Sequence, residues 1–243
     1  MITSPDNEKL KLARRLARRR RRGEEDLYVS EGEDLLAAGL AAGREPRFAL
    51  VAAGSGIDAG PATEEVAPEL LDRISSLGSG TRAIAVWPLR RSEPVGPICT
   101  YLHAIADPGN VGAIVRSAHA LTRGSVVAGP DCADPFGPRA VRASMGSIHA
   151  MAVASAGLDA TPEPRIALVA HGGDPIETLD ACGPPLTLCL GAERDGLPAD
   201  VIARCERRVT IALEPGGAES LNVAAAAAIA LGRVSSAAAR RGA

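Results

Sequence analysis

The chain has 243 residues, of which 46% are hydrophobic, and its formal net charge is −2. One Trp, two Tyr and two Phe are too few for a wall of stacked aromatic side chains, an arrangement common in single-strand RNA binders. No apolar run reaches the roughly 18 residues that a membrane span needs, and the five cysteines include no C-x-x-C pair. We therefore predict a cytoplasmic protein with no metal and no membrane association.

Charge is unevenly distributed along the chain. Residues 1–22 hold nine Lys or Arg against Asp6 and Glu8, so the remainder of the chain is acidic. A basic arm on an acidic body suggests contact with a polyanion such as RNA. A solvated helix or a flexible tail would explain the same residues, and charge alone does not decide between these interpretations.

The first 90 residues have the pattern of a small α/β unit. A helix is expected over residues 4–22, where Pro5 lies in the first turn and Leu10, Ala13 and Leu16 share a face. A second helix is expected over residues 30–43, closed by Gly43. Strands are expected at 47–54 and 82–89, with a partly helical segment, 64–77, between them.

A polar stretch with two prolines, RRSEPVGP, follows at residues 90–97 and is typical of a linker. Beyond it, short apolar runs (ICTYLHAIA, SVVAG, IALVA, LTLCLG and RVTIAL) alternate with helical segments, the last running from Ser220 to about Arg240. This pattern predicts a parallel α/β sheet covered by helices on both faces. The predicted domains are residues 1–90 and 98–243, joined by a linker at 91–97.

Three junctions at the ends of predicted strands carry polar residues that folding alone does not require. They are DPGNVGAIVRSAHAL (107–121), LCLGAERDGLP (188–198) and IALEPGGAESLNVAAAAAIAL (211–231). Parallel sheets bind ligands beyond the carboxyl ends of their strands, so the three loops are expected to converge on one pocket. Taken singly, each has a simpler explanation: Asn110 and Ser220 as helix caps, and Glu193 as a solvated loop carboxylate.

In order, these three motifs resemble those of the SpoU/TrmH family of RNA 2′-O-ribose methyltransferases. The segment ADPFGPRAVRASMGSIHAMAV (133–153) resembles the stretch between the first two family motifs, and residues 2–43 resemble a small substrate-binding domain that often precedes the catalytic one. The resemblance implies a C-terminal domain of the SPOUT superfamily with a trefoil knot, S-adenosylmethionine as cofactor, and a homodimer. The third motif departs from the family pattern, because Ile211 is followed by Ala212 where the family usually has Pro.

The resemblance also implies site residues. The predicted catalytic residues are Arg116, Asn110, Glu193, Ser220 and Asn222. The predicted cofactor-binding residues are Leu190, Gly191, Ile211, Leu213, Ser220 and Leu221. The family assigns the arginine that matches Arg116 to activation of the ribose hydroxyl. Because a guanidinium stays protonated at ordinary pH, we expect Arg116 to hold the adjacent phosphate and orient the hydroxyl rather than to act as a base.

The predicted activity is transfer of a methyl group from S-adenosylmethionine to a ribose 2′-OH of structured RNA. Ribosomal RNA is favoured over transfer RNA because the separate N-terminal domain suits a large folded RNA. The alternatives are a tRNA 2′-O-methyltransferase, an enzyme of the same class that methylates a base nitrogen, and a non-catalytic RNA-binding or ribosome-assembly factor.

Overall fold

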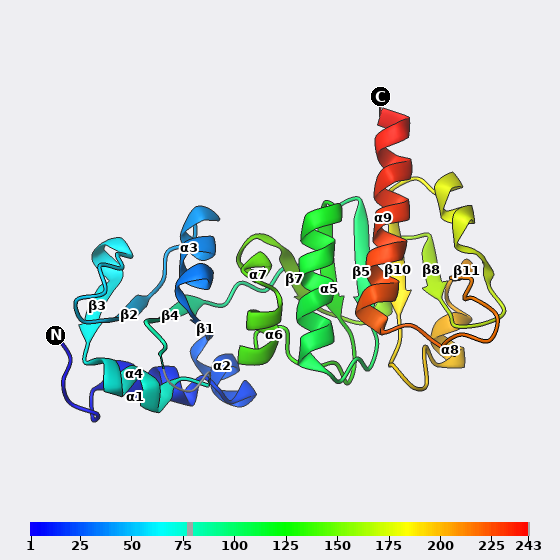
Figure 1. Ribbon diagram of the computed structural model, residues 1–243. Helices are drawn as coiled ribbons and strands as arrows, with labels where there is room; N and C mark the ends of the chain where they lie inside the picture. The colour runs from blue at the N-terminus through cyan, green and yellow to red at the C-terminus, as the bar shows by residue number, and fades with distance from the viewer. Residues whose placement is uncertain (77–79, 243) are drawn as a thin grey trace. The chain divides into compact units, whose positions relative to one another are not determined.

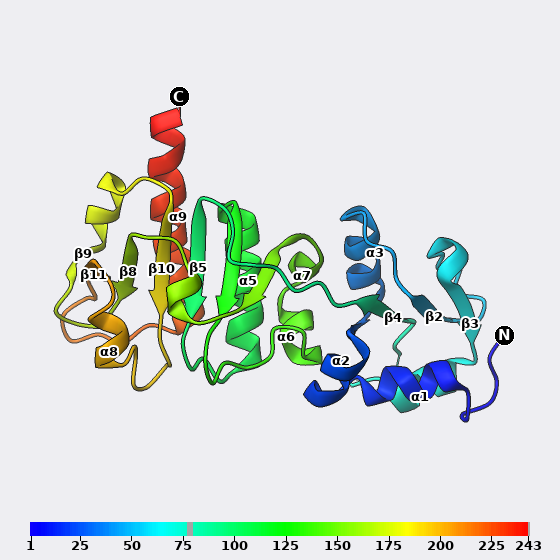
Figure 2. The same ribbon diagram turned by 180° about the vertical axis from the view of Figure 1, so that it is seen from behind.

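The computed structural model describes residues 1–76 and 80–242 (Figures 1 and 2). The chain forms two compact units, Met1–Arg90 with Asp134–Ala150 and Arg91–Ala133 with Met151–Ala243. The first unit therefore includes a segment, residues 134–150, that lies within the domain predicted for 98–243. The functional division into domains at 1–90, 91–97 and 98–243 stays a prediction.

The first unit is built on a four-stranded sheet of order β1-β4-β2-β3, in which β4 is antiparallel to β1 and β2 while β2 and β3 are parallel. The strands are β1 (Leu27–Glu31), β2 (Phe48–Ala52), β3 (Thr63–Val66) and β4 (Ala83–Pro88). The helices are α1 (Glu8–Arg15), α2 (Arg19–Glu25), α3 (Glu33–Ala41), α4 (Pro68–Ile74), α6 (Pro138–Ala143) and α7 (Ser147–Ala150), with a 3-10 turn η1 (Gly60–Ala62).

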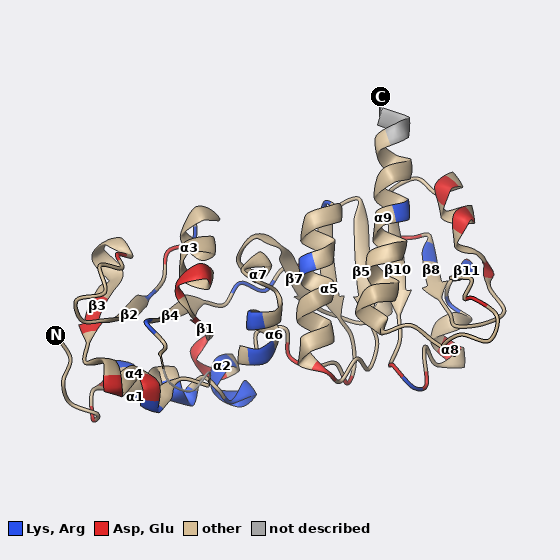
Figure 3. Ribbon diagram, viewed as in Figure 1, with Lys and Arg blue, Asp and Glu red and all other residues tan. Residues whose placement is uncertain are grey.

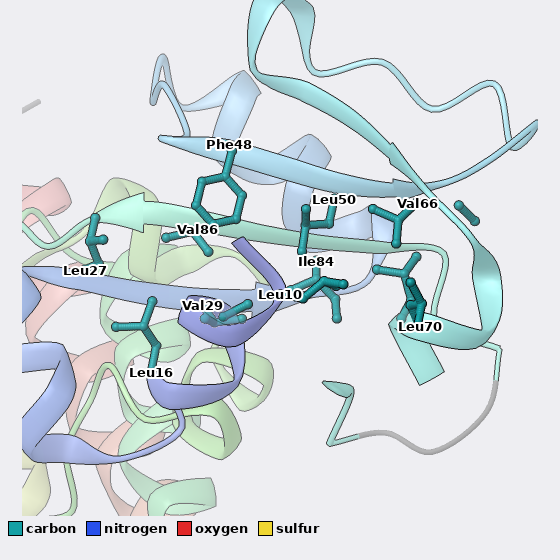
Figure 4. Close-up of a cluster of buried hydrophobic side chains, with 13 residues drawn as sticks. Leu10, Leu16, Leu27, Val29, Phe48, Leu50, Val66, Leu70, Ile84 and Val86 are labelled. Carbon is teal, nitrogen blue, oxygen red and sulfur yellow. The ribbon is translucent and has the colours of Figure 1, made fainter. Parts of the chain in front are cut away.

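One face of this sheet is covered by α1 and α4. Leu10 and Leu16 from the α1 region and Leu70 from α4 pack against Phe48 and Ile84 of the strands (Figure 4). Each fully buried side chain of this kind contributes about 1.5–3 kcal/mol of transfer free energy. The N-terminal residues are thus part of a hydrophobic core.

The first segment differs from the single helix predicted over 4–22. Asn7 caps α1 by accepting a hydrogen bond from the Lys9 amide, the helix ends at Arg15 with Leu16 as its C-cap, and Arg18 has extended backbone before α2 begins. Strand β1 was also missed, because its C-terminal residues fall in the predicted helix 30–43. Ser30 instead lies in the strand and accepts a hydrogen bond from the Trp87 indole at 2.8 Å.

The second unit contains a seven-stranded sheet of order β7-β6-β5-β10-β8-β11-β9 in which every neighbouring pair is parallel. The strands are β5 (Ile98–Leu102), β6 (Gly124–Ala128), β7 (Ala152–Ser155), β8 (Arg165–Leu168), β9 (Asp174–Pro175), β10 (Leu186–Leu190) and β11 (Arg207–Thr210). The helices are α5 (Pro108–Leu121), α8 (Ala199–Ile202) and α9 (Val223–Gly242), with 3-10 turns η2 (Leu158–Ala160) and η3 (Ile176–Ala181).

The predicted parallel α/β architecture is confirmed for this unit. Helices α5 and α9 pack side by side against the sheet (Figures 1 and 2). Apolar residues around α8, among them Leu197 and Val201, pack with Tyr101 and Cys189 of the strands. The short edge strands β7 and β9 lie outside the predicted strands, and the segment between β8 and β10 forms η3 rather than the predicted helix.

Parallel strand direction brings the carboxyl ends of β5, β8, β10 and β11 to one edge of the sheet, where the three predicted junctions lie. Among residues 1–76 and 80–242, no helix is both long and apolar enough to cross a membrane. The same described residues contain no group of three or more His, Cys, Asp or Glu side chains suited to holding a metal ion.

Candidate functional site

The junction between β5 and α5 presents Asn110 in the first turn of the helix. Asp107 is the N-cap, and one of its carboxylate oxygens accepts from the backbone amides of Gly109 and Asn110 at 2.6 and 3.1 Å. Pro108 follows at the first helical position, where its missing N–H costs nothing. The alternative explanation of Asn110 as the cap is therefore wrong, and its side chain is left for another partner.

The loop after β10 is held in a tight backbone arrangement. Ala192 and Gly196 exchange two backbone hydrogen bonds of 3.1 and 3.0 Å, so Glu193 lies in a closed hairpin loop. Gly191 permits this closure, because a Cβ at that position would lie 2.1 Å from the Gly196 carbonyl carbon. The glycine before the acidic residue thus has a steric role in shaping the loop.

The junction between β11 and α9 presents Asn222. Its side-chain oxygen accepts from the backbone amides of Ala224 and Ala225 at 2.9 and 3.3 Å, which caps the alanine-rich helix. The alternative explanation of Ser220 as the cap is therefore wrong. The amide nitrogen of Asn222 remains able to donate.

The three junctions meet through a chain of side-chain hydrogen bonds. Asn222 donates from Nδ2 to Oδ1 of Asn110 at 3.0 Å, and Asn110 donates from Nδ2 to Oε1 of Glu193 at 2.7 Å. These residues are separated by 112 and 83 positions in the chain. The second bond is charge-assisted, and together the two bonds fix the orientation of the Glu193 carboxylate. We call Asn110, Asn222 and Glu193 the Asn–Asn–Glu cluster.

A cavity of about 370 Å³ adjoins this cluster, and Glu193 lines it. All six predicted cofactor-binding residues line the same cavity: Leu190, Gly191, Ile211, Leu213, Ser220 and Leu221. Its wall combines apolar side chains with exposed polar groups. The cavity is therefore able to hold a ligand that has both an apolar ring and polar ends.

Sequence reasoning missed three further polar residues that line this cavity: His171, Arg194 and Glu219. His171 directly follows the apolar run IALVA, which contains most of β8. Parallel sheets bind ligands beyond the carboxyl ends of their strands, and this rule, which pointed to Glu193 after β10, applies equally to His171. Arg194 and Glu219 are neighbours of predicted residues. Their position beside Glu193 and Ser220 was the available signal.

Arg116 is not brought to the Asn–Asn–Glu cluster. It lies six residues after Asn110 on α5, about 9 Å along the helix axis and on a different face. Its side chain is exposed, does not line the cavity, and makes no hydrogen bond or ion pair with any described residue. A free guanidinium at this position is able to bind an external anion.

The thiol of Cys189 lies in the buried strand β10, one residue before Leu190, which lines the cavity. Its hydrogen bond with Cys205, together with burial, raises the pKa of Cys189, while the same bond lowers the pKa of Cys205. Cys189 therefore stays protonated. Because it packs among Tyr101, Leu197 and Val201, it acts as an apolar core residue and not as a nucleophile.

Comparison with known proteins gives relatives over both parts of the chain. A solved structure of an AdoMet-bound rRNA methyltransferase from Sinorhizobium meliloti superposes with a TM-score of 0.83 at 26% identity, covering 96% of each chain. The 23S rRNA (uridine(2479)-2′-O)-methyltransferase of Streptomyces viridochromogenes is 37% identical over 135 residues, 50% of this chain and 46% of that protein.

The ribosomal RNA small subunit methyltransferase G 2 of Syntrophobacter fumaroxidans is 34% identical over 177 residues, 69% of this chain and 34% of that protein. The chain thus spans between one third and one half of the length of these two curated relatives. The profile of the SpoU rRNA Methylase family matches residues 97–232, more than half of the chain and the range that holds all three junctions. The family resemblance is confirmed: the chain belongs to the SpoU rRNA Methylase family.

Proposed function

We propose that the chain transfers a methyl group from S-adenosylmethionine to a ribose 2′-OH of RNA, with ribosomal RNA favoured over transfer RNA. The observation that carries this proposal is the Asn–Asn–Glu cluster beside a cavity lined by all six predicted cofactor-binding residues. A relative that acts on a 2′-oxygen of 23S rRNA and an AdoMet-bound structural relative support it.

The cavity's residues fit S-adenosylmethionine. Apolar side chains of Leu190, Ile211 and Leu213 suit a purine ring, and the exposed hydroxyl of Ser220 suits the polar methionine end. When bound, the cofactor supplies a methyl group activated by a sulfonium. The residues of the chain then have to place a ribose oxygen against that methyl and accommodate the proton that the hydroxyl loses.

The Asn–Asn–Glu cluster is suited to accommodating the proton that the ribose hydroxyl loses. Oε1 of Glu193 accepts a hydrogen bond from Asn110, and this bond holds the carboxylate in one orientation. The position of the second carboxylate oxygen, Oε2, is fixed as a result. We assign Arg116 the phosphate next to the reacting ribose, since a planar guanidinium binds a phosphate through paired hydrogen bonds. With the phosphate held, the hydroxyl is oriented before reaction rather than during it.

The experiment that tests this function uses ribosomal RNA and S-adenosylmethionine labelled in its methyl group. After incubation, the RNA is digested to nucleosides and the base is separated from the sugar by cleavage of the glycosidic bond. The proposal predicts label in the ribose. Label in the base would support the base-methylating alternative, label only in transfer RNA would move the substrate, and no label in either RNA would favour the non-catalytic factor.

We also propose that two copies of the chain form a homodimer. Helices α5 and α9 expose Leu121 and Ile229, 36% and 42% of whose surface is accessible, and α9 carries many small residues that permit close approach. Arg116 is exposed on α5, so a partner packed near it would help to enclose the reacting RNA. Sedimentation analysis of the chain and of Ile229→Asp tests this; a monomeric unmodified chain would contradict it.

A trefoil knot belongs to the same proposal. Strand β10 lies between β5 and β8, which both precede it in the chain, and α9 packs on α5 after the chain has passed through β11. A knotted chain pulled from its ends stops short of full extension, which single-molecule stretching measures. Full extension would contradict the knot.

A cytoplasmic location is also part of the proposal, supported by the rRNA-directed activity in the relatives' names.

A further inference from the structure

Arg22 is the one member of the basic run at 18–22 whose side chain is buried, with 4% of its surface exposed. It donates from Nε and Nη2 to Oδ2 of Asp134 at 3.0 and 2.6 Å, and from Nη1 to the carbonyls of Leu16 and Ala17 at 2.7 and 2.9 Å. The guanidinium therefore binds the end of α1 and the segment 134–150 at once. It is not available to an external anion.

The remaining arginines of α1 and α2 divide into two groups. Arg20 and Arg21 both pair with Glu24, so this one carboxylate neutralises half of their combined charge. The other arginines are exposed and have no ion pair with any residue that the structure describes; they are Arg14, Arg15, Arg18 and Arg19. Arg142 of α6 is likewise exposed and has no such ion pair.

The four exposed arginines of residues 14–19 and Arg142 of α6 belong to one region of the first unit. Helix α6 packs against β1, the edge strand of the four-stranded sheet. Arg22 of α2 donates to Asp134, which lies just before α6 in the chain. Arg14 of α1 and Pro138 of α6 line the same hollow of about 230 Å³. Basic residues of α1, α2 and α6 are seen together in this unit in Figure 3.

We propose that Arg14, Arg15, Arg18, Arg19 and Arg142 form one RNA-backbone-binding face, the composite basic face, and that the Arg22–Asp134 pair is a positioning pair that holds its two parts together. The inference deepens the proposed function, on which it rests for the choice of RNA as partner. It differs from the predicted arm of residues 1–22 in two respects: residues 134–150 contribute a contact, and Arg22 does not.

Charge complementarity identifies the occupant. Five unneutralised guanidinium groups suit a row of phosphates, each of which accepts paired hydrogen bonds from a planar donor. The five aromatic side chains of the chain are all buried, which leaves none exposed for stacking on bases. The face therefore recognises the RNA backbone, and sequence selection is left to the second unit.

The test compares single charge removals at two places in the first unit. Arg142→Gln removes a charge from the composite basic face, and Arg47→Gln removes an exposed charge before β2, outside it. Binding of a fluorescent synthetic RNA hairpin is measured across a range of salt concentrations. We expect Arg142→Gln to weaken binding about three- to fivefold and to lower the salt slope by about 0.7–0.9, with Arg47→Gln unchanged.

Arg142→Lys retains the charge and is expected to restore most of the affinity. Equal effects of Arg142→Gln and Arg47→Gln would overturn the composite face, as would an unmodified chain that does not bind the hairpin. Titration with S-adenosylmethionine checks the second unit in every variant. A chain that binds hairpin as described but transfers no methyl group contradicts the proposed function and leaves the face intact.

The positioning pair has its own test in Asp134→Asn, measured beside Glu25→Gln. Both changes remove one carboxylate from the neighbourhood of α2, so charge alone predicts that both strengthen RNA binding. If Asp134 positions α2 through Arg22, Asp134→Asn weakens binding instead, while Glu25→Gln strengthens it slightly. Stronger binding by Asp134→Asn would overturn the positioning role. Should Asp134→Asn not fold, the Arg142 comparison still decides whether the face exists.

Discussion

Two hydrogen-bonded clusters, one in each unit, join residues that are far apart in the chain, and they differ in burial. In the first unit, Oη of Tyr28 and Nδ1 of His149 lie 2.8 Å apart, buried against the Trp87 ring, whose centroid is 4.6 Å from that of His149. In the second unit, the Asn–Asn–Glu cluster is largely exposed and adjoins the 370 Å³ cavity.

The difference separates structural from functional polarity. The Tyr28–His149 bond is enclosed by Trp87 and Phe136, so no ligand reaches it. Its loss would lower the free energy of unfolding. The Asn–Asn–Glu cluster adds little to a core, yet it holds a carboxylate in one orientation at a cavity. Changes in the first cluster should therefore alter stability, and changes in the second should alter binding and turnover.

The largest effect is expected from Gly191→Ala. Its added Cβ would meet the backbone of Gly196, so the loop that carries Glu193 must move. We expect S-adenosylmethionine affinity, measured by calorimetric titration, to fall about 100-fold, a loss of about 2.8 kcal/mol of binding free energy, because this loop forms part of the cavity wall. Gly157→Ala is the matched control in the same unit, because nothing lies within 4 Å of its added Cβ. Similar affinities in the two variants would contradict the role given to this loop.

Asn110→Ala is expected to have the next largest effect. It removes both side-chain hydrogen bonds of the Asn–Asn–Glu cluster, and methyl transfer should fall about 100-fold or somewhat less while the unfolding temperature changes little. Asn7→Ala is the counterpart in the first unit. By removing the cap of α1 it should cost about 1 kcal/mol of stability without slowing transfer. The reverse pattern would break the comparison.

Acid should weaken the first cluster selectively. Burial lowers the pKa of His149 to about 4 in the folded chain, against 6.5 for the unburied side chain. Because the unfolded chain binds the proton first, stability is lost as pH falls from about 6.5 toward 4. Between pH 8 and pH 5 the loss is about 2 kcal/mol. Denaturant titrations of the unmodified chain and of His149→Gln measure it, and an equal slope in both would exclude His149 as the cause.

Tyr28→Phe should have the smallest effect of this series. It leaves Nδ1 of the buried His149 without its partner and should cost about 1 kcal/mol of unfolding free energy, with methyl transfer unchanged. Thermal unfolding and a transfer assay on the same sample check both parts. A variant that unfolds normally but transfers slowly would place the first cluster in the functional machinery.

The sequence was sufficient where a pattern is local. Apolar runs such as LTLCLG predicted the buried strands, and polar residues after strands predicted the convergence of Asn110, Glu193 and Asn222, because parallel strands end at one edge. It was insufficient where distant residues decide the structure. Ser30 begins an apparent helix but lies in β1, where the Trp87 indole donates to its hydroxyl.

Contacts that the local pattern does not reveal also explain why the burial of Arg22, the cap of α5 and the position of His171 were not predicted. Arg22 resembles its four basic neighbours in sequence, and its buried contact with Asp134 joins residues 112 positions apart in the chain. Asp107 rather than Asn110 caps α5, a choice that depends on the backbone of the turn. His171 follows a strand and lines the cavity, but it is flanked by no motif that marks it.

The most direct test of the central claim, that the cavity beside the Asn–Asn–Glu cluster holds the methyl donor, is calorimetric titration of the full chain with S-adenosylmethionine. We predict saturable binding that the demethylated product, S-adenosylhomocysteine, displaces. Absence of binding heat at any concentration reached, with the chain folded, would contradict it.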